Sequence, residues 1–181
     1  VSTLRLNRYT YEGRAAEKGK AMIKVGDKLP AFTFLTPTAD GGRTEITTDD
    51  VFAGKKVILV AVPGAFTPTC SKTHVPGFIQ KFEEIRAKGI DAIAVTAVND
   101  AYVLGAWRDA LGAGDKIVFL ADGAAAFAKE IGLNLDPSPS MGVRSKRYAA
   151  IVENGVVREL QVEEKSSEAT CSAAPSILEK L

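Results

Sequence analysis

The sequence is poor in the residues that build metal centres and disulfide scaffolds. Its 181 residues include one histidine, His74, and two cysteines, Cys70 and Cys171. So few nitrogen and sulfur ligands argue against a dedicated transition-metal site. Two cysteines are also too few for a disulfide-stapled scaffold, and a chain of this length does not need one. We therefore expect no metal and no bound cofactor.

The sequence also lacks a marked charge excess and a long apolar run. Lys and Arg together number 23 against 22 Asp and Glu, a net charge of +1. This balance gives no electrostatic reason to bind nucleic acid or an anionic membrane. The longest apolar run, residues 57–62, is far shorter than the about 20 residues that a membrane-spanning helix needs. With 46% hydrophobic residues, the chain is expected to form one domain with a substantial core.

Residues 1–21 differ from the remainder, since they are polar and carry more basic than acidic side chains. Two interpretations stay open, the remnant of an organelle transit peptide and a plain surface arm. We assign the compact domain to residues 22–181. Reducible cysteines suit the cytoplasm or the mitochondrial matrix, and the basic leader favours a mitochondrion. The C-terminal Glu179–Leu181 resembles the peroxisomal Ser-Lys-Leu signal only in part, so a peroxisome-like organelle is less favoured.

The hydrophobic pattern predicts an α/β domain. Strands are expected at residues 31–35, 44–47, 57–62, 90–98, 116–121, 148–152 and 156–162, and helices at 49–52, 70–88, 99–111, 124–131 and 174–181. Pro76 and Gly77 interrupt the pattern of the helix at 70–88, so we expect a kink or a slow start of the helix there. Strands that alternate with helices and end in a hairpin predict a central mixed β-sheet with helices on both faces.

The most informative stretch is Pro63–Ser71, which follows the apolar run 57–62 and precedes a helical pattern. It predicts a strand, a tight loop, a cysteine and a helix, in that order. Cys70 then lies at a helix N-terminus, where unpaired N–H groups and the helix dipole stabilise a thiolate. The alternative is a buried core cysteine, but the polar, turn-forming loop favours a reactive thiol.

Two distant segments offer partners for Cys70. Cys171 lies among small residues before the last helix. Its thiol could condense with a sulfenic acid on Cys70, or it could be a free surface cysteine. Three basic residues, Arg144, Lys146 and Arg147, precede the strand at 148–152. A guanidinium from this group could stabilise the sulfur and hold an oxygen-rich substrate, or the group could be a solvated basic turn.

Two residues near Cys70 in sequence are further candidates. The hydroxyl of Thr67 could reach the sulfur, although such hydroxyls usually cap the local backbone. His74 lies one helical turn beyond Cys70, and a Cys–His pair would suggest a papain-like nucleophile. A residue at this spacing lies along the same helix face, and the sequence offers it no orienting partner. We therefore predict that His74 is a helix residue and not a general base.

These residues resemble a known family. The segment Pro63–Gly77, PGAFTPTCSKTHVPG, is similar to the active-site signature of the peroxiredoxins. Its form resembles the type II branch, which includes the atypical two-cysteine peroxiredoxin five proteins. Further segments resemble other motifs of the family: Lys24–Asp27, Val98–Asp100 with Trp107, Arg144–Tyr148, and Thr170–Pro175.

The resemblance implies a thioredoxin-like fold and a thiol peroxidase that reduces hydrogen peroxide and alkyl hydroperoxides. Cys70 would be the peroxidatic cysteine, with Thr67 and Arg147 as its hydrogen-bonding and charge partners and Pro63 as a cover against solvent. Cys171 would be the resolving cysteine, which closes a disulfide within one chain. A thioredoxin-like protein would reduce that disulfide. Members of this branch often form homodimers.

The sequence departs from the family pattern at two places. Many bacterial and plant members carry their second cysteine at the position that Val95 holds here, so that route to a disulfide is closed. In the family, the loop that corresponds to Asp136–Gly142 helps to line the mouth of the active site. Here it contains Pro-Ser-Pro, so the sequence does not predict which residues it contacts.

Two other functions use the same thiol. A thiol–disulfide oxidoreductase would carry a C-x-x-C motif at the strand–helix junction, but Thr67 occupies the partner position. A non-enzymatic redox sensor or relay would need only a reactive thiol, and the sequence does not separate it from a peroxidase.

Overall fold

A computed structural model describes residues 20–136 and 141–181 of the chain. Residues 1–19 of the expected N-terminal extension lie outside the described residues, as do residues 137–140 of the Pro-Ser-Pro loop. Near the start of the described residues, Ile23 is buried and its N–H donates to the carbonyl of Ile131 at 2.8 Å.

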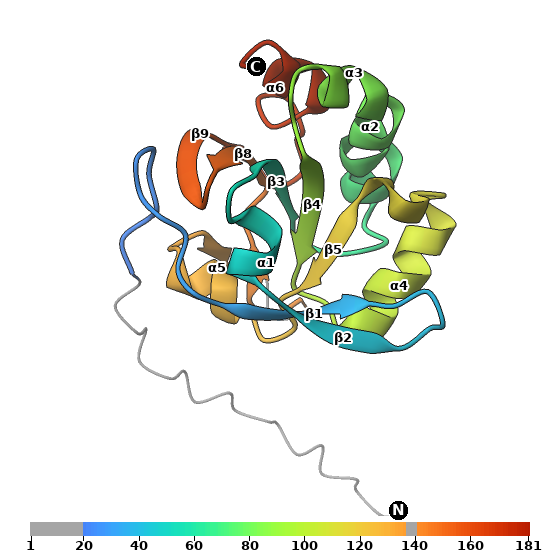
Figure 1. Cartoon of the computed structure of the whole chain (residues 1–181). Coiled ribbons are helices and arrows are strands. Elements are labelled where there is room, and N and C mark those ends of the chain that lie inside the picture. The colour runs from blue at the N-terminus through green and yellow to red at the C-terminus, as the bar shows by residue number, and fades with distance from the viewer. Residues whose placement is uncertain (1–19, 137–140) are drawn as a thin grey trace, which may run out of the picture.

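A seven-stranded mixed sheet forms the centre of the domain (Figure 1). Its strands in spatial order are β2 (Arg43–Thr47), β1 (Thr33–Pro37), β5 (Val118–Ala121), β4 (Ala92–Ala97), β3 (Lys56–Val62), β8 (Tyr148–Glu153) and β9 (Val156–Val162). The three central strands β5, β4 and β3 are parallel, and the flanking pairs are antiparallel. The apolar runs predicted as buried strands are therefore the middle of the sheet. A second sheet pairs only β6 (Asn134–Leu135) with β7 (Arg144–Ser145).

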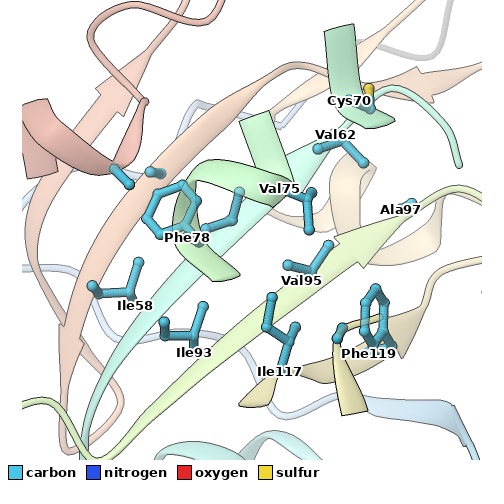
Figure 2. Packing of buried hydrophobic residues seen from close by; sticks show 14 of the residues in the cluster. Ile58, Val62, Cys70, Val75, Phe78, Ile93, Val95, Ala97, Ile117 and Phe119 are labelled. Atoms are coloured by element: carbon cyan, nitrogen blue, oxygen red, sulfur yellow. The ribbon is translucent and has the colours of Figure 1, made fainter. Parts of the chain in front are cut away.

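Helices cover both faces of the sheet, as Figure 1 shows. One face packs against α2 (Val75–Gln80), α3 (Phe82–Ala87), α4 (Ala101–Ala110) and α6 (Ala174–Leu178), and the other against α1 (Thr48–Phe52) and α5 (Ala126–Glu130). Alternate residues of β3 supply the two cores, because successive side chains of a strand point to opposite faces. Ile58 lies in the first core with Phe78 (Figure 2), and Leu59 lies in the second with Phe52 and Phe127. This is the thioredoxin-like, mixed-sheet architecture that the sequence predicted.

The helix predicted at 70–88 is irregular at two places. The chain from Cys70 to His74 is a π-helix, and α2 begins only at Val75, which agrees with the slow start expected at Pro76 and Gly77. The helix also breaks at Lys81, whose φ is −91° and ψ is 9°, and this break was not predicted. The last π-type bond runs from the N–H of Val75 to the carbonyl of Cys70, so Pro76 lies in the first turn of α2, where its missing N–H has no cost.

The two-sided core predicts unequal effects of two leucine truncations. Leu59→Ala removes a side chain that is 1% exposed and should lower the free energy of unfolding by about 3 kcal/mol. Leu160→Ala acts on a half-buried residue of β9 and should cost only about 1 kcal/mol. Urea unfolding of both variants measures the difference, and equal losses would contradict this description of the core.

Candidate active site

The loop between β3 and the π-helix is fixed by contacts to neighbouring elements. The N–H of Ala65 donates to Oδ1 of Asn99, at 2.8 Å. Phe66 adopts a positive φ of 61°, a conformation that is rare for a residue other than glycine and that clusters at functional sites. Gly64 lies so close to Arg144 that a Cβ there would meet Nη1 at 3.2 Å. These contacts set the position from which the helix starts.

Cys70 is the first residue of the π-helix and is fully buried. Figure 2 shows it at the end of the sheet where Val62 completes β3. Next to it, the hydroxyl of Ser71 accepts a hydrogen bond from Nε1 of the buried Trp107, at 2.9 Å. Single π-turns inside helices occur often at functional sites, and this one carries the candidate thiol.

Two donors reach the Cys70 sulfur. Oγ1 of Thr67 lies 2.8 Å from Sγ, and Nη2 of Arg147 donates to Sγ at 3.2 Å. Arg147 is 2% exposed. The register of the sheet places Arg147 near Cys70. Ala61 on β3 pairs with Tyr148 on β8, so Arg147 lies level with the end of β3. Both groups are placed to donate hydrogen bonds to the sulfur.

The Thr67 hydroxyl links the sulfur to the loop backbone. Its oxygen lies 2.8 Å from the sulfur and 2.8 Å from the carbonyl oxygen of Gly64. A hydroxyl has one proton to donate. With a thiol at Cys70, the S–H can donate to the hydroxyl while the hydroxyl donates to Gly64. With a thiolate, the hydroxyl can turn its proton to the sulfur. The arrangement therefore accommodates both protonation states of Cys70.

The other two basic candidates make their hydrogen bonds away from the sulfur. Arg144 donates from Nη1 to the carbonyl of Val98, at 2.9 Å, and Lys146 donates its backbone N–H to the carbonyl of Leu133. Of the three basic candidates, Arg147 is thus the one that contacts Cys70. Pro63 is buried directly after β3. Cys171 is half-buried, and both cysteines are free.

His74 has a structural partner on each ring nitrogen. Nη1 of Arg147 lies 3.0 Å from Nδ1, and a guanidinium can only donate, so Nδ1 accepts. The ring proton is then on Nε2, which faces the carbonyl and hydroxyl oxygens of Ser172 at 3.0 and 3.1 Å. Burial, reinforced by the charge of Arg147, lowers the pKa of His74 to about 4. The lone pair on Nδ1 already accepts the hydrogen bond from Arg147, so His74 is not a general base for Cys70.

Glu163 is a polar residue that the sequence reasoning missed. Its carboxylate accepts hydrogen bonds from the N–H and hydroxyl groups of both Thr170 and Ser172, the residues that flank Cys171. Burial alone would raise the pKa of Glu163, but these bonds outweigh it and lower the pKa to about 2. Burial, with a contribution from the charge of Glu163, raises the pKa of the Cys171 thiol. Nothing local distinguishes Glu163 from the exposed Glu164, so only the fold shows its role.

Two classes of site find no support in residues 20–136 and 141–181. No group of three or more His, Cys, Asp or Glu side chains in these ranges is placed to hold a metal ion. None of the helices in the same ranges has both the length and the apolar character to cross a bilayer.

Comparison with known proteins gives a consistent set of relatives. The redoxin family model matches residues 24–178. The chain is 48% identical to chloroplastic peroxiredoxin-2E of Arabidopsis thaliana over 166 residues, which cover 89% of the chain and 70% of that protein. It is 41% identical to peroxiredoxin-2C of Oryza sativa subsp. japonica, over 89% of the chain and 99% of that protein. The crystal structure of reduced Prx3 from Vibrio vulnificus in complex with hydrogen peroxide superimposes with a TM-score of 0.83 and 46% identity, covering 88% of this chain and 99% of the other.

The buried, neutral state of His74 predicts a pH dependence of stability. The pKa of this histidine falls from 6.5 to about 4 on folding, so between these values the unfolded chain binds a proton that the folded chain does not. The free energy of unfolding should therefore decrease as the pH falls from 6.5 towards 4. In His74→Gln this part of the decrease should be absent, because the chain has no other histidine.

Urea midpoints across that pH range measure the effect in both proteins. The contributions of Glu163 and Asp122, whose pKa values also shift on folding, are present in both and cancel to first order in the comparison. Parallel curves for the two proteins would contradict a buried, neutral His74.

Proposed function

Because the chain belongs to the peroxiredoxins of the redoxin family, which are thioredoxin-dependent peroxidases, we propose that Cys70 is its peroxidatic residue and Cys171 its resolving residue. The observation that supports this assignment best is the pair of donors on one buried sulfur, Thr67 Oγ1 at 2.8 Å and Arg147 Nη2 at 3.2 Å. Pro63, buried at the start of the same loop, limits the access of solvent to it.

In the first step the Cys70 thiolate attacks the terminal oxygen of a hydroperoxide. A sulfur–oxygen bond forms and the O–O bond breaks, so the sulfur is oxidised by two electrons and the peroxide is reduced. The leaving oxygen departs as hydroxide or alkoxide and takes up a proton, giving water or an alcohol. Arg147 stabilises the negative charge that spreads over the oxygens in the transition state. The buried position of the sulfur favours small substrates, hydrogen peroxide and alkyl hydroperoxides.

In the second step the thiol of Cys171 attacks the sulfenic sulfur of Cys70. A disulfide forms, and the sulfenic oxygen leaves as water. A disulfide requires Cα atoms within about 7 Å of each other, so the segment that carries Cys171 has to place it within that distance of Cys70. In the reduced structure Arg147 donates to the carbonyl of Ser166, and His74 faces Ser172. These contacts dock the segment of Cys171 beside the site of Cys70.

A thioredoxin-like dithiol completes the cycle by thiol–disulfide exchange: it attacks the 70–171 disulfide and is itself oxidised, while Cys70 and Cys171 become thiols again.

Both cysteines must be kept reducible, which fits a reducing compartment. The relatives named as chloroplastic and the basic residues 1–21 together favour an organelle, with the plastid added to the mitochondrion as a candidate. Homodimer formation, expected from the resemblance, stays part of the proposal.

Removing the Thr67 hydroxyl should slow the oxidation of Cys70. Thr67→Val keeps the size of the side chain but cannot donate to the thiolate, and we expect an oxidation rate constant about tenfold lower. Thr67→Ser, the matched control, keeps the hydroxyl and should stay near the wild-type rate. Stopped-flow peroxide consumption measures both, with Cys70→Ser as the inactive reference.

Two outcomes would count against the peroxidatic assignment. Turnover in Cys70→Ser would exclude Cys70 as the nucleophile. A wild-type oxidation no faster than that of a free thiol in buffer would favour a redox sensor or relay over a peroxidase.

Removing Cys171 should separate oxidation from recycling. Cys171→Ser should consume one equivalent of peroxide rapidly and then fail to turn over with thioredoxin, because no disulfide is available for exchange. NADPH-coupled thioredoxin cycling measures the second part. Unchanged cycling in this variant would show that Cys171 has no part in the reaction.

A further inference from the structure

A continuous line of hydrogen bonds joins Glu163 to the Cys70 sulfur. Oε1 of Glu163 accepts from the Ser172 hydroxyl at 2.7 Å, and that hydroxyl lies 3.1 Å from Nε2 of His74. Nδ1 of His74 is 3.0 Å from Arg147, which donates to Cys70 at 3.2 Å. Four of the five side chains are at most 2% exposed, and Glu163 is 7% exposed.

The direction of every bond in this line follows from the carboxylate. An ionised carboxylate only accepts, so the Ser172 hydroxyl donates its proton to Glu163. The hydroxyl oxygen then offers a lone pair to the N–H at Nε2 of His74. With that proton on Nε2, Nδ1 is free to accept from Arg147. Glu163 thus orders the same ring that orients the guanidinium at the sulfur.

Glu163 also holds both neighbours of Cys171. Its carboxylate accepts from the backbone N–H of Thr170 at 2.6 Å and of Ser172 at 2.8 Å. Its own backbone N–H donates to the carbonyl of Arg147 at 3.0 Å. One residue therefore anchors the Cys171 loop to the residue that contacts the Cys70 sulfur.

The segment from Glu163 to Ala174 contacts Arg147 and the helical segment around Cys70 at further points. Thr69 donates from its hydroxyl to the carbonyl of Ser167 at 2.9 Å, and Arg147 donates to the carbonyl of Ser166 at 2.8 and 3.1 Å. Ala174 lies beside Gly77 of α2. Within this segment, Glu163 accepts four hydrogen bonds from the residues on either side of the second thiol.

We propose that Glu163 is the positioning residue for disulfide formation: it presents Cys171 to the oxidised Cys70 by holding Thr170 and Ser172. The inference rests on the proposed function, in which Cys171 resolves the sulfenic acid. Glu163 makes no hydrogen bond to the Cys70 sulfur, and it acts mainly on the segment that carries Cys171. Its loss should slow the second step more than the first.

Three substitutions separate position from charge. Glu163→Ala removes all four acceptor contacts. Glu163→Gln keeps them, because the amide oxygen can accept from Ser172 and the Thr170 N–H while the amide nitrogen donates to the Thr170 hydroxyl. Glu164→Ala removes the neighbouring exposed carboxylate and is the matched control. Ser172→Ala, which breaks only the hydroxyl link between Glu163 and His74, provides a second test if Glu163→Ala does not fold.

The experiment is rapid quenching after one equivalent of hydrogen peroxide, followed by thiol blocking and mass analysis of Cys70 and Cys171. We expect Glu163→Ala to form the 70–171 disulfide at least about tenfold more slowly than wild type, with a smaller effect on the loss of the Cys70 thiol. Ser172→Ala should be slowed in the same step. Glu164→Ala should form the disulfide at close to the wild-type rate, and Glu163→Gln at least as fast, because it keeps the contacts and removes a charge that raises the pKa of the Cys171 thiol.

Disulfide formation at the wild-type rate in folded Glu163→Ala, or in Ser172→Ala where Glu163→Ala does not fold, would overturn the inference. A rate in Glu163→Gln as slow as in Glu163→Ala would overturn it as well, because the hydrogen-bonding geometry would then not be what matters. Cys171→Ser in the same experiment tests the premise separately. The proposed resolving role of Cys171 fails if the wild-type protein forms no 70–171 disulfide and its Cys70 oxidises as it does in Cys171→Ser. This outcome does not depend on the results for the Glu163 variants.

Discussion

The buried guanidinium of Arg147 is the constraint on which the site depends. A cation in the interior is costly unless its donors are satisfied. Arg147 is 2% exposed, and its donors go to the Cys70 sulfur, to Nδ1 of His74 and to the carbonyl of Ser166. Each partner has to be an acceptor, so the same residue that donates to the Cys70 sulfur also requires a free lone pair on Nδ1 of His74. The two segments that carry the cysteines meet at this one side chain.

The sheet explains why these groups meet. β3 leads into the loop and helix of Cys70, and β8, its neighbour in the sheet, starts with the residue after Arg147. β9 pairs with β8 and ends at the residue before Glu163. Residues far apart in sequence therefore arrive at one end of three adjacent strands. Asn99 accepts a hydrogen bond from the N–H of Ala65, and Trp107 donates one to the hydroxyl of Ser71. Cys70 is therefore held in place by these contacts as well as by Arg147.

The sequence allowed most of the fold to be predicted, because apolar runs and turn residues mark the central strands and the Cys70 loop directly. It did not allow the break at Lys81 or the π-turn to be predicted, since these depend on hydrogen-bond register rather than on composition. Composition alone left Arg144, Lys146 and Arg147 equivalent, and the family resemblance was needed to choose Arg147. Glu163 could not be found at all, because its burial depends on the return of the chain from β9 to α6.

In the proposed cycle a peroxide-oxidised Cys70 is resolved by Cys171 of the same chain. This is tested by peptide mass mapping without reduction, after one equivalent of hydrogen peroxide, on protein separated by size under denaturing conditions. We expect a cross-linked pair of peptides containing Cys70 and Cys171 in the monomer fraction. A Cys70 sulfenic or sulfinic acid beside an unmodified Cys171, or the same cross-link found only between two chains, would contradict it.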